Sequence, residues 1–489
     1  MRLSKSRFTA GLQCHKRLYL QVHQPELAAE PDKSAQARFE QGIEVGRVAR
    51  GLFPEGVLVE AEHSELHKAL VRTSRLVTDG KAPAVFEATF DHQKVLVRVD
   101  VLQRLAKGKR WKLIEVKSST RMKDYHVPDV AIQRFVLEGL GFSVIPCLML
   151  LNREYIYDGR AYDLTKLFKT EDVTAETDNL IKDVPTEVRE QLKMLSKGAA
   201  PEVKPGPQCN NPFQCEFFGV CNKPVPADHV SCLPRISEFK LRRLAELGVN
   251  SIRDIPSGFP LTEMQQHAFA SAVSGKAWFS KELGKTLKEL KYPICFMDFE
   301  TFGPAIPRFA GMSPFDQIPF QWSVHVQRKG RNEVEHYEFL AEDASDPRQA
   351  FLKSLMRVLG DTGHIVVYHQ PFESGVLASL ATCFPEHKSA VNGLQGRLWD
   401  LLPVIRSHTY HIDYRGSFSL KDVLPALVPE MTYDGMEVAE GNEAGLAWER
   451  MIHGQVDDAE KRRLRTALLA YCEQDTLAMV RLLDVLRAG

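Results

Sequence analysis

The sequence predicts an α/β protein made of two or three domains. Its 489 residues are more than a single hydrophobic core usually serves. Apolar runs with strand character alternate with segments of helical periodicity, which is the pattern of α/β domains. Hydrophobic residues make up 44% of the chain and charged residues 26%, the balance of an ordinary globular protein.

The composition indicates a compartment and leaves the binding partner open. We find no apolar run of about 18 residues, the length that a membrane span requires, and the start of the chain lacks the apolar core of a signal peptide. We therefore expect a cytoplasmic protein with no membrane partner. The 63 Lys and Arg residues balance 63 Asp and Glu residues, so net charge neither supports nor excludes a nucleic acid. In that compartment, regularly spaced cysteines predict metal binding rather than disulfides.

Three blocks are expected along the chain. The first, residues 1–225, holds the regularly spaced cysteines and a strand-rich middle. We expect its main elements to be strands at 85–90, 94–105, 109–119 and 143–151 and a helix at 129–140. The second block, residues 226–290, begins Pro-rich and continues as two short helices around a Gly turn. The third block, residues 291–489, alternates helical segments with strands at 292–301, 318–327 and 364–369.

The stretch FMDFET places Asp298 and Glu300 one residue apart on the first strand of the third block. Side chains alternate between the two faces of a strand, so both carboxylates point the same way. Two like charges side by side are unfavourable unless a cation lies between them. This strand therefore predicts a cation site.

Two later segments offer further ligands. Glu373 lies at the expected start of a helix that directly follows the strand HIVVY. Tyr471 and Asp475 are four residues apart on a strongly periodic helix, so they share one of its faces. Carboxylate oxygens suit Mg²⁺ and Mn²⁺, and two such ions about 4 Å apart activate water for phosphodiester hydrolysis. We predict that these residues meet Asp298 and Glu300 at one site.

This constellation resembles the motifs of the DnaQ-like (DEDD) exonucleases, which have an RNase H-like fold. Asp298 and Glu300 match the first motif, and Tyr471 and Asp475 match the tyrosine version of the third, which makes this the DEDDy subtype. The resemblance implies roles for five residues: Asp298, Glu300 and Asp475 as metal ligands, Glu373 at the second metal or its water, and Tyr471 at the nucleophilic water.

The second motif of this family usually reads Phe-Asp. The chain has Phe372 and Glu373 at this place, and Glu is one methylene longer than Asp. Asp400, in the stretch LWDLL, is an alternative carboxylate for this position.

The middle of the first block carries a second set of charges. Glu115 and Lys117 lie on one face of the strand in LIEVKSST, and Asp100 ends the preceding strand. Acidic side chains can hold a metal ion, and a neighbouring lysine can position water or stabilise phosphate charge. Gln133 follows on the expected helix, and Glu87 is a further acidic candidate.

These residues, in this order, resemble the PD-(D/E)XK core of the RecB-like nucleases. The family often carries a Tyr four residues after the Gln, where this chain has Leu137. It also usually carries a His on its first helix, whereas the corresponding segment here, FEQGIEVGRVAR, contains none. The resemblance implies Asp100 and Glu115 as metal ligands, Lys117 at the water and phosphate, and Gln133 as a positioning residue.

Cys209, Cys215 and Cys221 follow one another at intervals of six residues, and Cys14 stands alone near the start. This arrangement resembles the iron–sulfur RecB-like nucleases, including the CRISPR-adaptation and AddB-type enzymes. The resemblance implies a [4Fe–4S] cluster that staples the two ends of the nuclease domain. Four thiolates also suit tetrahedral Zn²⁺, which is one alternative, and buried cysteines without a metal are the other. Cys232 is a spare candidate ligand.

Basic residues are dense between Arg98 and Lys123, where a phosphate backbone could bind beside the predicted metal site. In the second block, KLRRLAELGVNSIRDIP resembles a helix-hairpin-helix element, whose Gly turn can bind backbone phosphate. The basic set comprises Arg98, Arg104, Lys107, Lys109, Arg110, Lys112, Lys117, Arg121 and Lys123.

The whole chain resembles bacterial proteins that join a RecB-like iron–sulfur nuclease domain to a DnaQ-like exonuclease domain. We expect a restriction-endonuclease-like first domain, a helical helix-hairpin-helix-like linker and an RNase H-like last domain. The resemblance implies a metal-dependent nuclease that acts on DNA, from a free end, in repair or in defence against foreign DNA. A 3′–5′ exoribonuclease and a nucleic-acid-binding scaffold with inactive sites are the alternatives.

Overall fold

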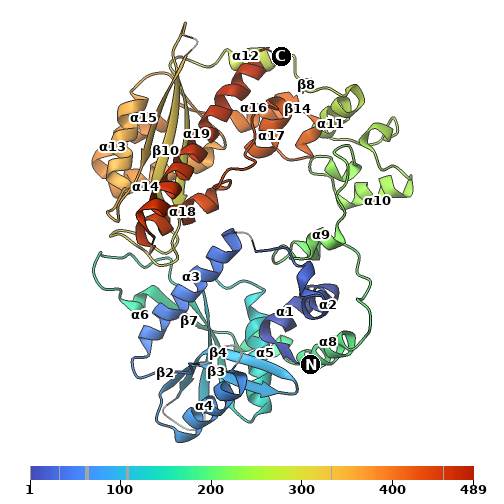
Figure 1. Ribbon diagram of the computed structural model, residues 1–489, viewed down its shortest axis with the longest axis vertical. Coiled ribbons are helices and arrows are strands. Elements are labelled where there is room, and N and C mark those ends of the chain that lie inside the picture. The colour runs from blue at the N-terminus through green and yellow to red at the C-terminus, as the bar shows by residue number, and fades with distance from the viewer. Residues whose placement is uncertain are drawn as a thin grey trace. The chain divides into compact units, whose positions relative to one another are not determined.

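The computed structural model divides into two compact units (Figure 1). The structure describes residues 2–31, 33–60, 65–105, 110–331, 333–454 and 456–488. The first unit comprises Met1–Pro224 and Pro304–Asp316, and the second comprises Val225–Gly303 and Gln317–Gly489. Residues 226–290, expected as a linker, are therefore part of the second unit, and a short segment of the expected third block is part of the first.

A mixed sheet forms the centre of the first unit. Its strands are Leu3–Ser4 (β1), Val57–Leu58 (β2), Ala84–His92 (β3), Val95–Arg104 (β4), Arg110–Lys117 (β5), Ser143–Leu151 (β6) and Phe168–Asp172 (β7). They follow the order β2-β3-β4-β5-β6-β7, and β1 pairs with the start of β4. β3, β4 and β5 are antiparallel neighbours, whereas β5 and β6 are parallel.

Helices cover both faces of this sheet. They are Lys5–Gln13 (α1), His15–His23 (α2), Lys33–Ala49 (α3), Leu66–Asp79 (α4), His126–Gly139 (α5), Leu164–Leu167 (α6), Thr174–Leu180 (α7), Val184–Leu195 (α8) and Phe218–Cys221 (α9). Val130 of α5 belongs to the same core as Leu113 of β5. Val45 of α3 belongs to a second core, with Ile114, the next residue of that strand. Because neighbouring strand residues face opposite ways, α5 and α3 lie on opposite faces of the sheet.

The second unit is built on a five-stranded sheet. Its strands are Ile294–Phe302 (β9), Ile318–Gln327 (β10), Val334–Leu340 (β11), His364–Val367 (β12) and Leu398–Asp400 (β13), in the order β11-β10-β9-β12-β13. β9, β10 and β11 are antiparallel neighbours, and β12 runs parallel to both β9 and β13. A separate antiparallel pair joins Trp278–Phe279 (β8) to Thr409–Tyr410 (β14).

The helices of this unit lie on both faces of the larger sheet and, for Glu238–Glu246 and Glu263–Ser274, away from it (Figure 1). They are Glu238–Glu246 (α10), Glu263–Ser274 (α11), Leu283–Leu287 (α12), Arg348–Leu359 (α13), Gln370–Cys383 (α14), Lys388–Gln395 (α15), Leu401–His408 (α16), Leu420–Leu427 (α17), Gly441–His453 (α18) and Asp458–Ala488 (α19). Cys295, Met297 and Phe299 of β9 pack in one core with residues of α13, α14 and α15. The long α19 lies along β9 and β10 on the other face.

The expected strands are present as β3 to β6 and as β9, β10 and β12. The second short helix expected after the Gly turn is absent from the described residues of that segment, because Ile252–Asp254 forms only a single 3₁₀ turn. Gly248 has φ of 71°, the left-handed conformation in which glycine commonly ends a helix such as α10. The resemblance to two helices around a hairpin is therefore only partial.

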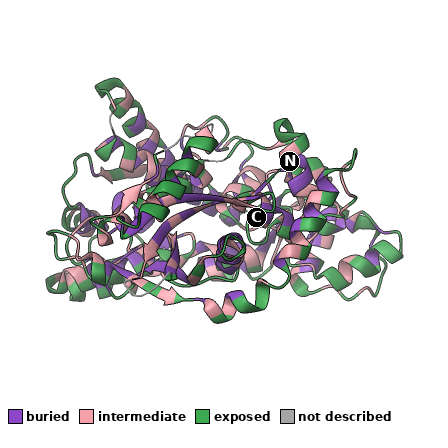
Figure 2. Cartoon of the chain, turned by 90° about the horizontal axis from the view of Figure 1, so that it is seen from below, coloured by how far each residue is buried: buried purple, intermediate pink, exposed green. Residues whose placement is uncertain are grey.

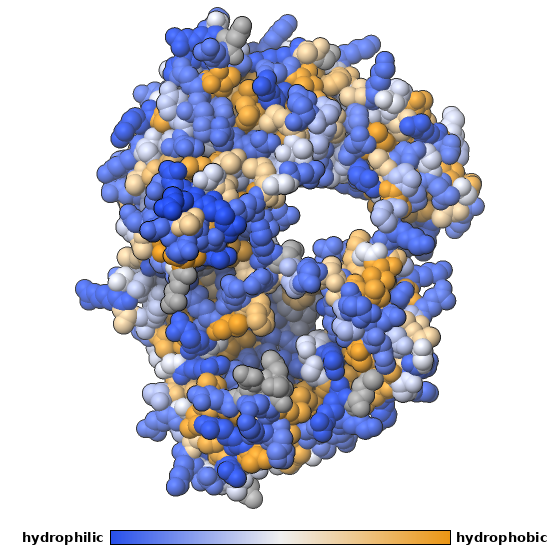
Figure 3. Space-filling model, viewed as in Figure 1, coloured by the Kyte–Doolittle hydropathy of each residue, from blue (hydrophilic) through white to orange (hydrophobic). Residues whose placement is uncertain are grey.

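Burial follows the sheets. Buried residues concentrate on the strands, whereas the helices also show intermediate and exposed residues (Figure 2). Hydrophilic residues predominate on the face seen in Figure 3, with hydrophobic residues scattered among them. Within the described ranges, no helix has both the length and the apolar character that crossing a membrane requires.

Candidate functional site

Asp298 and Glu300 lie on β9 beyond the point where this strand leaves β12. The two strands pair in parallel only over Ile294 to Phe296 of β9. Since the odd-numbered residues of β9 pack into the core beneath α13 and α14, both carboxylates project from the face that α19 covers. Beyond Phe296, no strand of the described residues pairs with β9 on its β12 side, so side chains of other elements can approach the two carboxylates there.

Tyr471 and Asp475 lie on the buried side of α19, with exposed fractions of 3% and 7%. One ligand atom each from Asp298, Glu300 and Cys472 lie within 4.8 Å of one another. Asp475 is the charged group that acts most strongly on both Asp298 and Glu300. The structure therefore brings together the residues that match the first and third motifs. We call Asp298, Glu300, Glu373 and Asp475 the acidic group.

Burial and mutual repulsion control the protonation of this acidic group. Removal from water raises the pKa of both Asp298 and Glu300 well above the usual range, and repulsion by Asp475 adds to this. Burial also raises the pKa of Asp475, although Tyr433 and Lys421 oppose the rise. Carboxylates in such surroundings become fully ionised only when a cation joins them. The acidic group is therefore suited to a divalent metal ion.

Glu373 lies in the first turn of α14, directly after β12. Only 2% of the residue is exposed, and among the described residues its Oε2 has no hydrogen-bond partner. Burial raises its pKa to about 8, and the charge of Asp400 contributes. Glu373 in turn raises the pKa of Asp298, so the two carboxyl groups are close enough to repel each other. A buried oxygen without a partner is what a metal ion, or water bound to it, would satisfy.

Asp400, the alternative carboxylate, has a different role. Its Oδ1 accepts hydrogen bonds from the backbone N–H groups of His369 (3.0 Å) and Leu402 (3.1 Å), and its Oδ2 accepts one from that of Gln370 (3.0 Å). Asp400 thus caps the starts of both α14 and α16. Because backbone N–H groups occupy both oxygens of Asp400, Glu373 is the better placed of the two to be the fourth carboxylate of the acidic group.

Two further residues, which the sequence did not predict, lie beside the acidic group. Tyr433 donates a hydrogen bond to Asp475 Oδ1 and is 8% exposed. Lys421, in the first turn of α17, places its Nζ 5.4 Å from the centre of the Tyr471 ring. No periodic pattern marks either residue, because Tyr433 lies in a loop and Lys421 is one of many helical lysines.

In the first unit, Asp100 and Glu115 lie where β4 and β5 separate. The strands pair only between Val101–Arg104 and Trp111–Ile114, so both acids are the first residues beyond the last pair. Asp100 Oδ2 accepts a 2.8 Å hydrogen bond from the backbone N–H of Val116. Burial and the neighbouring Glu115 charge raise the pKa of Asp100. The fork between the strands thus places two carboxylates side by side.

Glu115 is 2% exposed and is surrounded by donors. Lys5 Nζ lies 2.6 Å and Lys117 Nζ 2.9 Å from Glu115 Oε1. Gln133 Nε2 donates to Glu115 Oε2 at 2.7 Å, and Lys117 also pairs with Asp129. Although burial opposes ionisation of Glu115, the charges of Lys117 and Lys5 lower its pKa. Lys5 and Asp129 were not expected from the sequence.

Glu87 reaches the same place from β3. β3 and β4 keep one register across Phe86 and Ala88, which sets the unpaired Glu87, whose φ is 55°, opposite the unpaired Asp100. Its Oε1 accepts a 2.8 Å hydrogen bond from Arg50 Nη2, and its charge contributes to the raised pKa of Asp100. The surrounding pocket has a volume of about 900 Å³, and its lining includes Glu87, Asp100, Glu115, Lys117 and His126.

The four expected cysteine ligands line one narrow pocket of the first unit. Cys14 lies between α1 and α2, and Cys221 ends α9. Cys209 lies in the 3₁₀ turn Pro207–Cys209, and the backbone N–H of Cys215 donates to its carbonyl at 2.8 Å. Cys232, the spare candidate, belongs to the second unit and does not line this pocket.

The spacing of these thiols bears on the metal group that they fit. Gln13 Nε2 donates to the carbonyl of Gln208 at 2.7 Å, and Arg17 pairs with Glu216 at 2.8 Å, so the start of the chain is held against the cysteine loop. In the described part of the chain, no three of these sulfurs lie within 4.8 Å of one another. A tetrahedral zinc ion, with Zn–S bonds of about 2.3 Å, needs sulfurs about 3.8 Å apart. As they stand in this structure, these thiols are therefore too far apart for three of them to share one zinc ion.

The dense basic stretch is distributed among different environments. Lys117 and Lys123 line the 900 Å³ pocket. Arg104 instead stacks on Trp111, with its guanidinium carbon 4.1 Å from the ring centre, and donates to the carbonyl of Val77 at 2.6 Å. Two further members, Lys107 and Lys109, lie outside the described residues. Only part of the stretch is therefore placed to bind a phosphate at this pocket.

Comparison with known families gives one match. A protein-family model described as a domain of unknown function (DUF2779) matches residues 295–419. This range contains Asp298, Glu300 and Glu373 but ends before Tyr471 and Asp475. No curated protein and no solved structure gives a significant match to the chain.

Proposed function

We propose that this protein is a metal-dependent nuclease that hydrolyses the phosphodiester bonds of DNA. The observation that carries the proposal is the convergence of the acidic group from β9, α14 and α19 in the second unit. Burial and mutual repulsion disfavour the ionised forms of these carboxyl groups, and a bound cation would stabilise them. Carboxylate oxygens are the preferred ligands of Mg²⁺ and Mn²⁺. The other features of both units are consistent with this chemistry.

In the second unit, Asp298, Glu300 and Asp475 would hold the metal, and Glu373 would contact a second ion or its bound water. Divalent ions lower the pKa of bound water and stabilise the leaving oxygen in phosphodiester hydrolysis. Tyr471 is buried beside Asp475 and is suited to orient the attacking water. Lys421 offers the nearby positive charge that a phosphate requires.

We assign an RNase H-like fold to the second unit. The antiparallel β9, β10 and β11, with β12 and β13 added in parallel beside β9, support this assignment. The acidic pair on the central strand and the Tyr and Asp on the last helix occupy the places that the resemblance to DEDDy exonucleases implies. This family resemblance favours cleavage from a free end.

We assign the first unit to the PD-(D/E)XK nucleases. Support comes from the single cluster that Asp100, Glu115, Lys117 and Gln133 form at the fork of β4 and β5. The buried Oε1 of Gln133 has no partner among the described residues, so a bound ion or water would complete its hydrogen bonding. The four cysteines would hold a [4Fe–4S] cluster that fastens α1 and α2 to the loop before α9.

The test compares cleavage of matched, end-labelled DNA and RNA oligonucleotides by protein purified without oxygen, in Mg²⁺ or Mn²⁺. We expect DNA to be degraded by the wild type and by Asp484→Asn, an exposed change on α19. We expect Asp298→Asn to abolish degradation from the ends, and the double variant with Asp100→Asn to be inactive. Preferential cleavage of RNA would show that the substrate is RNA and not DNA. No cleavage of either polymer would favour a nucleic-acid-binding scaffold with inactive sites.

A further inference from the structure

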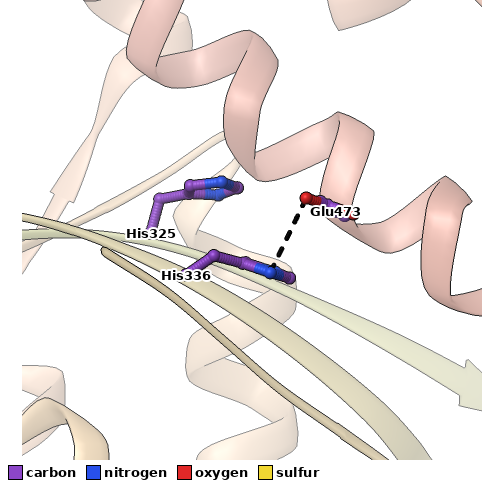
Figure 4. A group of neighbouring side chains, drawn as sticks. All are labelled: His325, His336 and Glu473. Atoms are coloured by element: carbon purple, nitrogen blue, oxygen red, sulfur yellow. Dashed lines mark ion pairs between the residues drawn. The ribbon is translucent and has the colours of Figure 1, made fainter. Parts of the chain in front are cut away.

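A second group of metal-binding side chains lies in the second unit. It consists of His325 on β10, His336 on β11 and Glu473 on α19. One donor atom from each residue lies within 4.8 Å of the other two. Figure 4 shows the two rings projecting from the strands toward α19, with the Glu473 carboxylate turned toward them. We propose that these three residues bind a metal ion that prefers nitrogen ligands, such as Zn²⁺.

The sheet register presents the two imidazoles together. His325 and His336 are direct cross-strand partners of β10 and β11, so both project from the same face. Their ring centres are 4.5 Å apart and the planes differ by 27°. His325 is 4% exposed, and the Glu473 side chain is 46% exposed, so one end of the group is buried and the other faces solvent. An ion can therefore reach the group from outside.

The hydrogen bonds around the rings indicate which nitrogens carry protons. The Thr476 hydroxyl donates its single proton to the backbone carbonyl of Glu473, with an O–O distance of 3.0 Å, because a carbonyl oxygen can only accept. Thr476 Oγ1 then accepts from the Ser323 hydroxyl and from His325 Nδ1, both at 2.8 Å. Ser323, having donated its proton, accepts from His336 Nε2 at 3.0 Å. With the hydroxyl protons assigned in this way, both rings carry their proton on the nitrogen that faces a hydroxyl.

This arrangement leaves two lone pairs for a metal ion, on His325 Nε2 and on His336 Nδ1. His336 Nδ1 faces Glu473 Oε1 at 3.7 Å, and two acceptors that face each other repel unless a proton or a metal ion lies between them. Two imidazoles and one carboxylate form a known zinc donor set. A hydrogen bond from the second nitrogen of each ligating histidine is the usual support of such a site. The hydroxyls of Ser323 and Thr476 provide that support here.

The site differs from the acidic group in its chemistry and in its expected consequence. Nitrogen donors favour zinc-like ions, whereas the oxygen-only acidic group favours Mg²⁺ or Mn²⁺. Glu473 lies between Tyr471 and Asp475 on α19, so an ion bound to it would fix this helix against β10 and β11. The effect on cleavage rests on the proposed function, but the binding of the ion does not.

The experiment measures Zn²⁺ binding to the full-length, chelator-treated protein by competition with a chromophoric chelator, without any nucleic acid. The variants are Glu473→Gln and His336→Gln, and the matched control is Glu338→Gln, two residues from His336 on the same face of β11. We expect the wild type and control to bind one equivalent of Zn²⁺ at this site, in addition to any Zn²⁺ that the cysteine pocket takes up. We expect Glu473→Gln to weaken binding at least tenfold and His336→Gln to abolish it.

Co²⁺ absorption then identifies the donors, because nitrogen and oxygen ligation gives visible bands without the charge-transfer bands of thiolates. Melting curves show that each variant is folded, and Zn²⁺ should raise the melting temperature of the wild type more than that of Glu473→Gln. Equal Zn²⁺ affinity in all four proteins would overturn the proposal. So would thiolate charge-transfer bands in the spectrum of the Co²⁺ that the wild type binds and Glu473→Gln does not. Because no cleavage is measured, failure of the proposed nuclease activity leaves this result unaffected.

Discussion

Lys5 Nζ lies 2.6 Å from Glu115 Oε1, across 110 residues of sequence. The pair fastens the first turn of α1 to the fork between β4 and β5, where Asp100 and Lys117 also lie. Lys5 therefore supplies a second positive charge to a site in which the sequence revealed only one. A cation at this place can hold Glu115 ionised and can stabilise the charge of a bound phosphate.

Removing this charge should weaken the first-unit site. In the Asp298→Asn background, where only this site is left, we expect Lys5→Met to lower the cleavage rate by about 100- to 1,000-fold, the usual effect of losing one electrostatic contact to a reacting group. Lys68→Met makes the same change on the exposed side of α4 and should leave the rate unchanged. An unaltered rate in Lys5→Met would show that Lys5 serves only to hold α1 in place.

Glu373 makes the stability of the metal-free protein dependent on pH. Burial raises its pKa from 4.5 to about 8, so the folded protein retains a proton that the unfolded chain has released in this interval. The free energy of unfolding should therefore fall as pH rises from about 4.5 to 8. Glu373→Gln removes this loss and should melt higher than the wild type at pH 8 in a chelator, with the difference shrinking toward pH 5.

The size of this effect is bounded, since each pKa unit corresponds to about 1.4 kcal/mol. Each kcal/mol shifts the melting temperature of a domain of this size by about 2–4 °C. Added Mn²⁺ should stabilise the wild type at pH 8 more than Glu373→Gln. The exposed change Glu386→Gln is the control, and an identical pH profile for Glu373→Gln and wild type would contradict the account of this carboxyl group.

Substitutions of Asp400 and Glu373 should have different effects on stability and on activity. Asp400→Asn perturbs the caps of α14 and α16, and loss of a cap typically costs about 1 kcal/mol. We expect this variant to melt a few degrees lower and to keep its affinity for Mn²⁺. Glu373→Gln should instead lose Mn²⁺ affinity and cleavage without melting lower. The reverse pattern would identify Asp400 as the metal ligand.

The cysteine pocket predicts the metal content of the protein. Cys14→Ser should lower the iron and sulfide bound per chain after purification without oxygen, and should reduce the visible absorption of the cluster. Cys383→Ser, in the second unit, should leave the iron content unchanged. Stoichiometric zinc without iron in the wild type would replace the iron–sulfur assignment by the zinc alternative.

The sequence predicted those parts of the sites that depend on local periodicity. Strand alternation placed Asp298 with Glu300 and Glu115 with Lys117, and helical spacing placed Tyr471 with Asp475, and each pair shares a site in the structure. These relationships follow from geometry within a single element.

The remaining contacts depend on chain segments that only the tertiary fold brings together. Lys5 is far from Glu115 in sequence, and Tyr433 reaches Asp475 from a loop without a repeating pattern. The pairing of His325 with His336 depends on the register of β10 and β11, which the sequence alone did not specify. Asp400 looked like a ligand because helix capping and metal binding use the same side chain.

The central claim is that the acidic group binds divalent metal ions, and Mn²⁺ binding to the metal-free protein tests it most directly. Electron paramagnetic resonance can count bound ions in the Asp100→Asn background, in which the first-unit site is impaired. We predict that Mn²⁺ binds to this protein and to its Asp484→Asn derivative, and that adding Asp298→Asn removes the bound ion. Equal Mn²⁺ binding with and without the Asp298 carboxylate, or no binding in any of these proteins, would contradict the account.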